Sequence, residues 1–203
     1  MIFLATSNFH KVEEIKRLLP GIELAPRPGW IPEVIEDGGS FEENSIKKAK
    51  AIALATGSPA ISDDSGLVVD ALGGSPGVHS ARYAGENATD EENLWKLLSE
   101  LLGVSNRSAR FVCVATYFMP NESFVTFKGE VEGRLLDSVT GHGGFGYDPI
   151  FVPDSGDGRS FAEMSMDEKA LYSHRSRAFM KLRDYLNSLH QALTQIDRAA
   201  QEF

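Results

Sequence analysis

Apolar residues fall into short runs and helical stripes, separated by polar segments that contain Gly and Pro. The apolar run 2–5 predicts a short buried strand, and residues 22–25 predict a second one. Between them, residues 11–19 predict a helix that ends at Pro20-Gly21, because neither residue readily continues a helix. The apolar positions of this helix are Val12, Ile15, Leu18 and Leu19.

Two further helix starts carry the Ser/Thr-x-x-Glu pattern of a capping box, in which side chains satisfy the first backbone N–H groups. Ser40 with Glu43 predicts a helix over 41–56, and Thr89 with Glu92 predicts another. The apolar face of the second helix comprises Leu94, Leu97, Leu98, Leu101 and Leu102.

The middle of the chain is rich in β-branched and aromatic residues, which favour strands. Residues 109–118 and 124–135 flank a Pro-Asn-Glu-Ser turn and predict a long hairpin. Shorter segments at 60–62 and 67–69 predict strand pieces on either side of an acidic turn. Residues 149–152 predict a last strand, after a Gly-rich loop.

A final helix is predicted to begin at Ser173, and the polar tail 194–203 is expected to fray. The apolar face of this helix comprises Phe179, Leu182, Leu186 and Leu189. Strands and helices are mixed along the chain around an antiparallel hairpin, and no repeat or linker interrupts them. We therefore predict an α/β fold with a mixed sheet, in one domain over residues 1–193.

Composition narrows the class of protein. The chain has 203 residues, 42% of them hydrophobic, which argues against disorder, collagen and a disulfide scaffold. It carries 20 Lys+Arg against 29 Asp+Glu, a net charge of −9. That acidity argues against binding to nucleic acid or an anionic membrane, because both need a broad basic face. At first sight it also argues against any polyanionic ligand.

The sequence also predicts a compartment. Cys113 is the single cysteine, so no disulfide forms within the chain. No run approaches the roughly 18 apolar residues of a membrane span. The N-terminal apolar run is too short for a signal peptide, and we expect a cytoplasmic protein.

The segment from Thr6 to Lys11 joins the first predicted strand to the first helix. Such a junction points backbone N–H groups and the positive end of a helix at one place, where an anion can bind. Thr6 and Asn8 add side-chain donors and Lys11 adds a charge. The ordinary interpretation is an N-cap with a solvated lysine, and periodicity alone favours it.

Asp63 and Asp64 place two adjacent carboxylates between apolar segments. Hard cations such as Mg²⁺ take carboxylate oxygens and often share them with substrate phosphates. Adjacent side chains of a strand point to opposite faces, so the two carboxylates share a metal only if the backbone turns there. The alternative is a polar turn without a ligand.

Two more segments could bind a ligand. The glycines of 141–146 fit the spacing G-x-G-x-x-G, but no helix follows them, which argues against a dinucleotide site. That loop presents Phe145, Tyr147 and Asp148. The two aromatic rings could stack on a planar base, with the acid beside it, or they could pack in the core. In 173–176, a His-Arg pair at a helix start opposes the helix dipole and so hints at a bound anion.

Taken in order, six segments resemble the inosine triphosphate pyrophosphatase family, and its bacterial branch most closely. They are Thr6–Lys11, Phe41–Ala49, Ser62–Leu67, Pro76–Tyr83, Gly143–Pro149 and Ser173–Arg175. Any one is a weak signal, but the ordered set spans about residues 2–189 and is highly specific. Ser7 stands where many relatives carry glycine.

The resemblance implies an elongated fold of two lobes, with a mixed sheet flanked by helices and the active cleft between the lobes. It implies a homodimer that depends on Mg²⁺. The implied reaction converts a non-standard purine nucleoside triphosphate (ITP, dITP or XTP) and water to the nucleoside monophosphate and pyrophosphate.

The family's site residues carry over motif by motif. Asp64 and Lys48 would be catalytic, with Asp64 as general base, and Glu36 and Asp64 would bind the metal. Phe145 would stack on the base, while Thr6, Asn8 and Lys11 would bind the triphosphate. The full set of implied substrate-binding residues is Thr6, Ser7, Asn8, Phe9, His10, Lys11, Asn44, Ser65, Phe145, Gly146, Tyr147, Asp148, Lys169, His174 and Arg175.

Two other functions remain open from the sequence. One is a nucleotide-binding module without catalysis, against which the presence of both Asp64 and Lys48 argues. The other is a pyrophosphatase of the same fold that acts on pyrimidine or other modified nucleotides. The charge of −9 permits a single triphosphate if Lys11, Lys48, Lys169 and Arg175 form one local positive pocket with Mg²⁺ bridging the acids.

Overall fold

The computed structural model describes residues 1–201 and contains one mixed six-stranded sheet. The strand order is β2-β1-β3-β4-β5-β6, with β2, β1 and β3 parallel and β3 to β6 antiparallel. The strands are β1 (Ile2–Leu4), β2 (Leu24–Ala25), β3 (Ala60–Val69), β4 (Ser108–Phe118), β5 (Phe124–Leu135) and β6 (Phe151–Pro153). The α/β class with a mixed sheet is thus confirmed.

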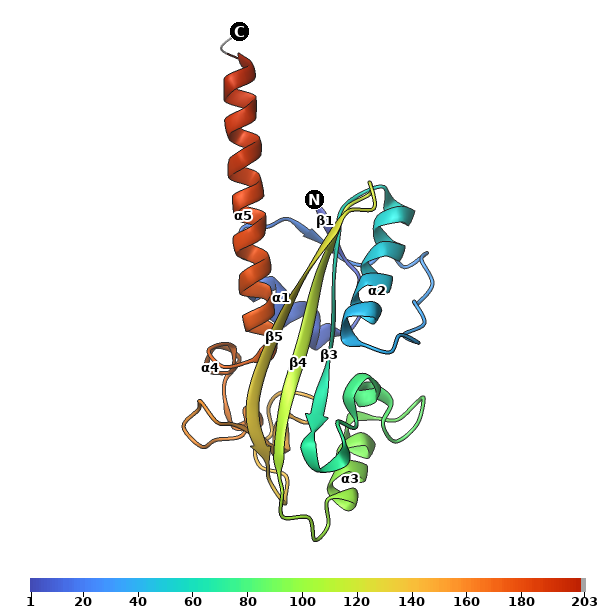
Figure 1. Ribbon diagram of the computed structural model, residues 1–203, viewed down its shortest axis with the longest axis vertical. Coiled ribbons are helices and arrows are strands. Elements are labelled where there is room, and N and C mark those ends of the chain that lie inside the picture. Colours follow the sequence, from blue (N-terminus) through green and yellow to red (C-terminus); the bar gives the residue numbers. More distant parts are fainter. Residues whose placement is uncertain (202–203) are drawn as a thin grey trace.

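Helices cover the sheet at different levels (Figure 1). The α-helices are α1 (Phe9–Leu18), α2 (Phe41–Thr56), α3 (Asp90–Glu100), α4 (Met166–Ala170) and α5 (His174–Gln201). Four short 3₁₀ helices are η1 (Asp70–Leu72), η2 (Gly77–Arg82), η3 (Asp148–Ile150) and η4 (Phe161–Glu163).

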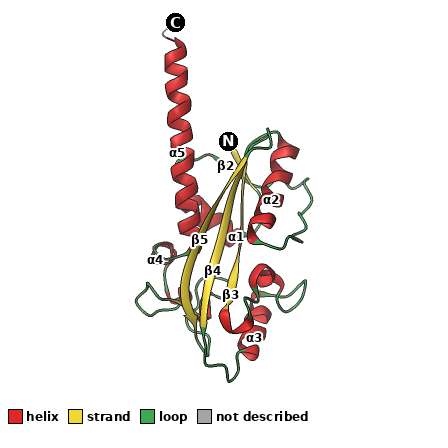
Figure 2. Cartoon of the chain, in the orientation of Figure 1, coloured by secondary structure: helices red, strands yellow, loops and turns green. Residues whose placement is uncertain are grey.

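The molecule is elongated, and the long strands β3, β4 and β5 run through both of its lobes (Figure 2). We call the half that contains α1, α2 and the start of α5 the helical lobe, and the half that contains α3, β6 and η4 the distal lobe. In the helical lobe, Ile15 and Phe179 pack on one face of the sheet and Ile52 packs on the other. Leu97 and Phe161 belong to the separate core of the distal lobe.

Most predicted elements are confirmed, with α2 spanning 41–56 as expected. The largest correction concerns β3, which runs unbroken over residues 60–69 with no acidic turn inside it. Residues 62–66 pair in register with 112–116 of β4. The polar residues stay in the strand because this ladder satisfies their backbone, while cations pair with Asp63 and Asp64 and Ser45 hydrogen-bonds to Ser62.

Smaller differences have local causes. Helix α1 begins two residues earlier than predicted because Asn8 caps it, with its side chain accepting from the Lys11 backbone N–H. Strand β6 begins at Phe151 because the preceding residues, with Pro149 among them, form η3. Leu102 is 80% exposed because α3 ends at Glu100.

The last helix differs from the prediction at its far end. Helix α5 continues to Gln201 rather than ending near residue 193, since no Gly or Pro interrupts residues 174–201. It stands away from the rest of the molecule toward its C-terminus (Figure 1). The division between a domain over 1–193 and a tail over 194–203 stays a prediction.

Candidate active site in the cleft between the lobes

A cavity of about 270 Å³ opens beside the edge of β3, where β1 ends. Strand β1 pairs only with Ala60 and Ile61 of β3, so no strand covers that edge from Ser62 onward. Side chains of both lobes line the cavity. Crevices at the carboxyl end of a strand, where neighbouring connections diverge to opposite faces of the sheet, are common ligand sites in such folds.

The loop after β1 is folded by its own side chains. The Thr6 hydroxyl accepts from the Asn8 backbone N–H at 3.2 Å, and the side-chain Oδ1 of Asn8 accepts from the Lys11 backbone N–H at 3.1 Å. The Ser7 hydroxyl donates to Glu33 at 3.2 Å, which ties this loop to the acidic loop before α2. Thr6, Ser7, Asn8 and Lys11 all line the cavity, as the anion-site interpretation requires.

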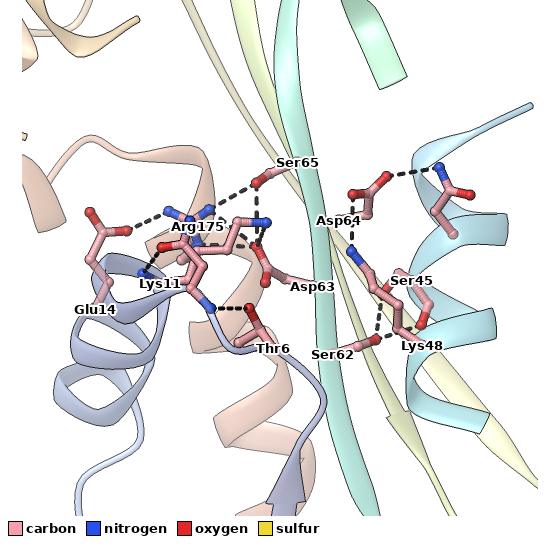
Figure 3. Close-up of polar contacts among 12 residues, drawn as sticks. Thr6, Lys11, Glu14, Ser45, Lys48, Ser62, Asp63, Asp64, Ser65 and Arg175 are labelled. Carbon is pink, nitrogen blue, oxygen red and sulfur yellow. Dashed lines mark hydrogen bonds and ion pairs between the residues drawn. The ribbon is translucent and has the colours of Figure 1, made fainter. Parts of the chain in front are cut away.

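Asp63 and Asp64 point to opposite faces of β3 and meet different partners (Figure 3). On one face, the Lys48 ammonium lies 3.2 Å from Asp64 Oδ1 and 3.0 Å from Glu36 Oε1. Asn44, one helical turn before Lys48, donates from Nδ2 to Asp64 Oδ2 at 3.3 Å. Asn44 is itself buried and does not line the cavity, so it orients Asp64 from behind.

A buried cluster of hydroxyls fixes α2 against the sheet. Ser45 Oγ lies 2.9 Å from Ser62 Oγ, and Ser62 donates to the Ser45 carbonyl at 2.6 Å (Figure 3). Ser45 Oγ also lies 2.7 Å from Thr116 Oγ1. Because Ser45 is a neighbour of Asn44 on α2, this cluster sets the position of the Lys48 side of the site. Sequence reasoning missed it, since serines in a helix and a strand carry no distinctive signal.

Charge and burial shift the pKa values on this face. Burial raises the pKa of Asp64 to about 6, and the charge of Glu36 adds to the rise while Lys48 and Lys11 oppose it. Burial also acts on Glu36, but attraction to Lys48 outweighs it and lowers the pKa of that carboxyl. Burial lowers the pKa of Lys48, yet Asp64 and Glu36 outweigh it, so the pKa stays above its ordinary value.

On the other face, Asp63 is fully buried and surrounded by cations (Figure 3). Its Oδ2 accepts from Lys11 Nζ at 3.2 Å and from Arg175 Nε and Nη2 at 3.3 and 3.1 Å. Burial raises the pKa of Asp63, but Lys11 and Arg175 outweigh it and hold that pKa well below its ordinary value. Ser65 donates to Asp63 at 3.3 Å and accepts from Arg175 at 2.8 Å.

Glu14 is a residue of the site that sequence reasoning missed. Its carboxylate lies 2.9 Å from Lys169 Nζ and accepts from Arg175 Nη1, so it joins two segments far away in the chain. Burial raises the pKa of Glu14, but Arg175 and Lys169 outweigh it and lower that pKa. A glutamate on the polar face of an amphipathic helix looks like an ordinary solvated residue in the sequence.

The Gly-rich loop presents Phe145 to the cavity from the distal lobe. The Phe145 backbone N–H donates to Asp148 Oδ2 at 3.0 Å, and the same oxygen lies 2.7 Å from Lys169 Nζ. The Gly146 backbone N–H donates to Asp90 Oδ2 at 2.9 Å. Tyr147 is 4% exposed and donates to the Ser80 carbonyl at 2.9 Å, so it belongs to the core as well as to the cavity wall.

His174 and Arg175 lie in the first turn of α5, where the Ser173 hydroxyl accepts from the Ser176 backbone N–H. The His174 ring stacks on Phe111 with centroids 4.7 Å apart, and its Nδ1 has no partner among the described residues. Burial and the charges of Arg175 and Lys169 hold the pKa of His174 well below its ordinary value, so the ring is neutral.

Besides Asn44, two of the residues implied by the resemblance lie outside the cavity. Phe9 is 70% exposed, and neither Phe9 nor His10 lines the cavity. The other implied residues that line it are Glu36, Lys48, Asp64, Ser65, Phe145, Gly146, Tyr147, Asp148, Lys169, His174 and Arg175.

Charges in the cleft are balanced rather than positive. The four cations Lys11, Lys48, Lys169 and Arg175 face the five carboxylates Glu14, Glu36, Asp63, Asp64 and Asp148. Among the side chains that the structure describes, residues 1–195, no group of three or more His, Cys, Asp or Glu is arranged to hold a metal by itself. A triphosphate therefore needs further positive charge beyond what the side chains supply.

The chain is similar to known proteins over most of its length. The model of the Ham1 family matches residues 2–185. A protein of Geobacter sulfurreducens named dITP/XTP pyrophosphatase is 50% identical over 192 residues, which cover 91% of this chain and 96% of that protein. A Bacillus subtilis protein of the same name is 44% identical over 191 residues, covering 91% and 96%.

Solved structures agree with these sequence matches. The Ham1 protein of Staphylococcus aureus superposes with a TM-score of 0.83 at 41% identity, covering 92% of this chain and 98% of that one. A HAM1 protein from Coxiella burnetii superposes with a TM-score of 0.84, also at 41% identity and with the same coverage.

Proposed function

Because the chain belongs to the Ham1 family, we propose that it hydrolyses non-standard purine nucleoside triphosphates to the nucleoside monophosphate and pyrophosphate. ITP, dITP and XTP are the proposed substrates, and their removal from the nucleotide pool is the proposed role. The observation that carries the proposal is one cleft that brings together lysines from separate helices, a carboxylate with a raised pKa and the aromatic ring of Phe145. The names of the relatives support the same activity.

The triphosphate would lie against the loop after β1. Backbone N–H groups at the start of α1, with Thr6, Asn8 and Lys11, can bind phosphate oxygens there. Lys48 reaches the same cavity from α2 and neutralises further negative charge. Neutralisation matters because the oxygens around the α-phosphorus otherwise repel an attacking nucleophile.

A magnesium ion fits this site next to Glu36 and Asp64. The two carboxylates already converge on one cation, the Lys48 ammonium, and Mg²⁺ commonly takes one or two carboxylates together with substrate phosphates. The balanced charge of the cleft is a second reason, because each cationic side chain already faces a carboxylate. Bound there, the ion would draw charge from the phosphate oxygens during attack.

Asp64 is proposed as the group that orients the attacking water and accepts its proton. Its raised pKa, about 6, suits a general base near neutral pH. Asp63 is a poorer candidate for the general base, because its carboxylate is already paired with Lys11 and Arg175 and its pKa is held low. The alternation of β3 thus supports the division of roles that the resemblance implied.

The purine base would stack on Phe145 and meet polar groups of α4 and α5. Arg175 uses four of its five N–H groups on Asp63, Glu14 and Ser65, which leaves one N–H on Nη1 for a purine 6-oxo group. A 6-amino group would place donor against donor there. An unpaired buried polar group costs about 1–3 kcal/mol, so a few such contacts separate ITP from ATP.

The quaternary structure and compartment are further proposals. The resemblance supports a homodimer in the cytoplasm, with neither nucleic acid nor membrane as partner. Of the helices in residues 1–201, none is long and apolar enough to cross a membrane.

A substrate panel tests the proposed function. Pyrophosphate release is measured with ITP, dITP, XTP, ATP, GTP and the pyrimidine triphosphates, with and without Mg²⁺. We expect release from ITP, dITP and XTP only when Mg²⁺ is present, with ATP and GTP poor substrates. Preference for a pyrimidine triphosphate would replace the substrate assignment, and binding without release would indicate a nucleotide-binding module.

The substitution Asp64→Asn tests the mechanism. It keeps the size of the side chain but removes the proton acceptor, so turnover should fall at least about 100-fold. Circular dichroism and thermal unfolding check that the fold is retained. Near-normal turnover in this variant would overturn the assignment of Asp64.

A further inference from the structure

Phe145, the proposed platform for the base, contacts a side chain of the other lobe. The ring centroids of His10 and Phe145 lie 5.2 Å apart and their planes differ by 9°, which is a stacked pair. His10 belongs to the first turn of α1, whereas Phe145 belongs to the loop between β5 and η3. The pair therefore links the helical lobe to the distal lobe at the edge of the cleft.

The loop around Phe145 does not by itself fix the orientation of the ring. Residues 141–146 contain four glycines, and Gly144 and Gly146 on either side of Phe145 have φ values of +70° and +59°. Asp148 and Asp90 hold the backbone of this loop through the N–H groups of Phe145 and Gly146. Those bonds do not fix the plane of a phenyl ring, which depends on what packs against it.

His10 packs against Phe145 from outside the cavity. Phe145 lines the cavity together with Lys169 and Arg175, whereas His10 does not. Lys169 Nζ lies 4.8 Å and the Arg175 guanidinium carbon 5.7 Å from the centroid of the Phe145 ring. Inside the cavity the Phe145 ring thus meets these two cationic groups, whereas the ring stacked on it is that of His10.

We propose that His10 is a positioning residue that fixes the plane of Phe145 for stacking on the base. This inference rests on the proposed function, since it assumes that a base stacks on Phe145. His10 also shares the first turn of α1 with Lys11, which faces the triphosphate. Phosphate binding that orders this turn therefore also orders the base platform, through the stacked pair.

A double-mutant cycle tests the proposal on the full chain, with the triphosphate that the panel shows to be hydrolysed fastest. His10→Ala should raise KM about fivefold and leave kcat within about twofold, because aromatic stacking acts on binding rather than on the reacting atoms. In a Phe145→Leu background, His10→Ala should have no further effect on KM. Independent effects of the two substitutions, or a lower KM in His10→Ala, would overturn the proposal.

Two variants separate positioning from a general structural role. His10→Phe retains a planar ring and should restore KM to within about twofold of the parent value. Lys16→Ala truncates an exposed residue of the same helix and should change neither constant. A failed rescue by His10→Phe, or an equal rise of KM in Lys16→Ala, would contradict the assignment.

The cycle stays informative if turnover is absent. The dissociation constant of ITP, measured by calorimetry on the same four proteins, then replaces KM. ITP binding without hydrolysis overturns the proposed function alone, and the cycle still decides the role of His10. Absence of ITP binding overturns both.

Discussion

At the residue scale, the structure shifts the pKa values of the adjacent residues Asp63 and Asp64 in opposite directions. Asp63 lies among Lys11 and Arg175, so attraction exceeds the cost of burial and its pKa falls. At Asp64 the cost of burial exceeds the attraction of Lys48, so its pKa rises to about 6. The charged Asp63 carboxylate therefore stabilises the fold, whereas the charged Asp64 carboxylate destabilises it.

This contrast predicts that substitutions of Asp63 and Asp64 change the free energy of unfolding in opposite directions. At pH 8 without added metal, Asp63→Asn should lower the free energy of unfolding by about 3–5 kcal/mol, because it leaves buried cations without their partner. Asp64→Asn should raise it by roughly 1–3 kcal/mol, because it removes a charge that folding disfavours. Urea unfolding of the two variants measures both changes.

The pH dependence follows from linkage. Asp63 has a depressed pKa, so its contribution is present above the ordinary value of 3.8 and is lost as pH falls further toward its folded pKa. Asp64 has a raised pKa, so the gain in unfolding free energy from Asp64→Asn is full above about pH 6. That gain disappears as pH falls to 3.8. Two changes of the same sign at pH 8 would contradict this account.

At the element scale, the position of α5 depends on one glycine of β5. A Cβ atom added to Gly129 would lie 2.1 Å from the His174 carbonyl oxygen and 2.5 Å from the Ala178 backbone nitrogen. The helix thus packs directly on the strand backbone, and this contact lies at the turn that carries His174 and Arg175. Sequence reasoning had no means of distinguishing this glycine from one in a loop.

Gly129→Ala should therefore impair both stability and catalysis. The clash involves backbone atoms on both sides, so α5 must shift, and we expect a loss of about 1–3 kcal/mol in unfolding free energy. The same shift displaces Arg175, so kcat/KM should fall about tenfold or more. Gly29→Ala is the control, since nothing lies within 4 Å of its added Cβ, and it should leave both quantities unchanged.

At the scale of the whole molecule, α5 extends past the part that the family model matches. The family model ends at residue 185, whereas the helix continues to Gln201. Within residues 186–195 of this extension, Leu186 is buried and Leu193 is 54% exposed. The cleft lies at the opposite end of this helix, next to its first turn.

Removal of residues 194–203 should leave kcat/KM within about twofold, because every residue of the cavity wall precedes this segment. The midpoint of thermal unfolding should move by only a few degrees, roughly the effect of 1 kcal/mol or less in a protein of this size. Pyrophosphate release and a thermal scan of the shortened chain provide the measurement. A large loss of activity would show that the tail supports the site.

The fold was largely accessible from the sequence, because hydrophobic spacing and capping residues act locally. The pattern around Ser40 predicted α2 to the residue, and the apolar runs predicted the hairpin of β4 and β5. The same local reasoning failed at residues 63–66, where it predicted a turn. Polar residues there stay extended because partners from distant segments, Lys11, Lys48 and Arg175 among them, neutralise the carboxylates.

The sequence by itself determined the residue types of the site, their order along the chain and the family that shares them, because motifs are local. Only the tertiary structure decided how those residues pair. Alternation along β3 sent Asp63 and Asp64 to different faces, and packing brought in Glu14, Asp90 and the Ser45 hydroxyl cluster. Such contacts depend on distances between atoms far apart in the chain, which no local pattern encodes.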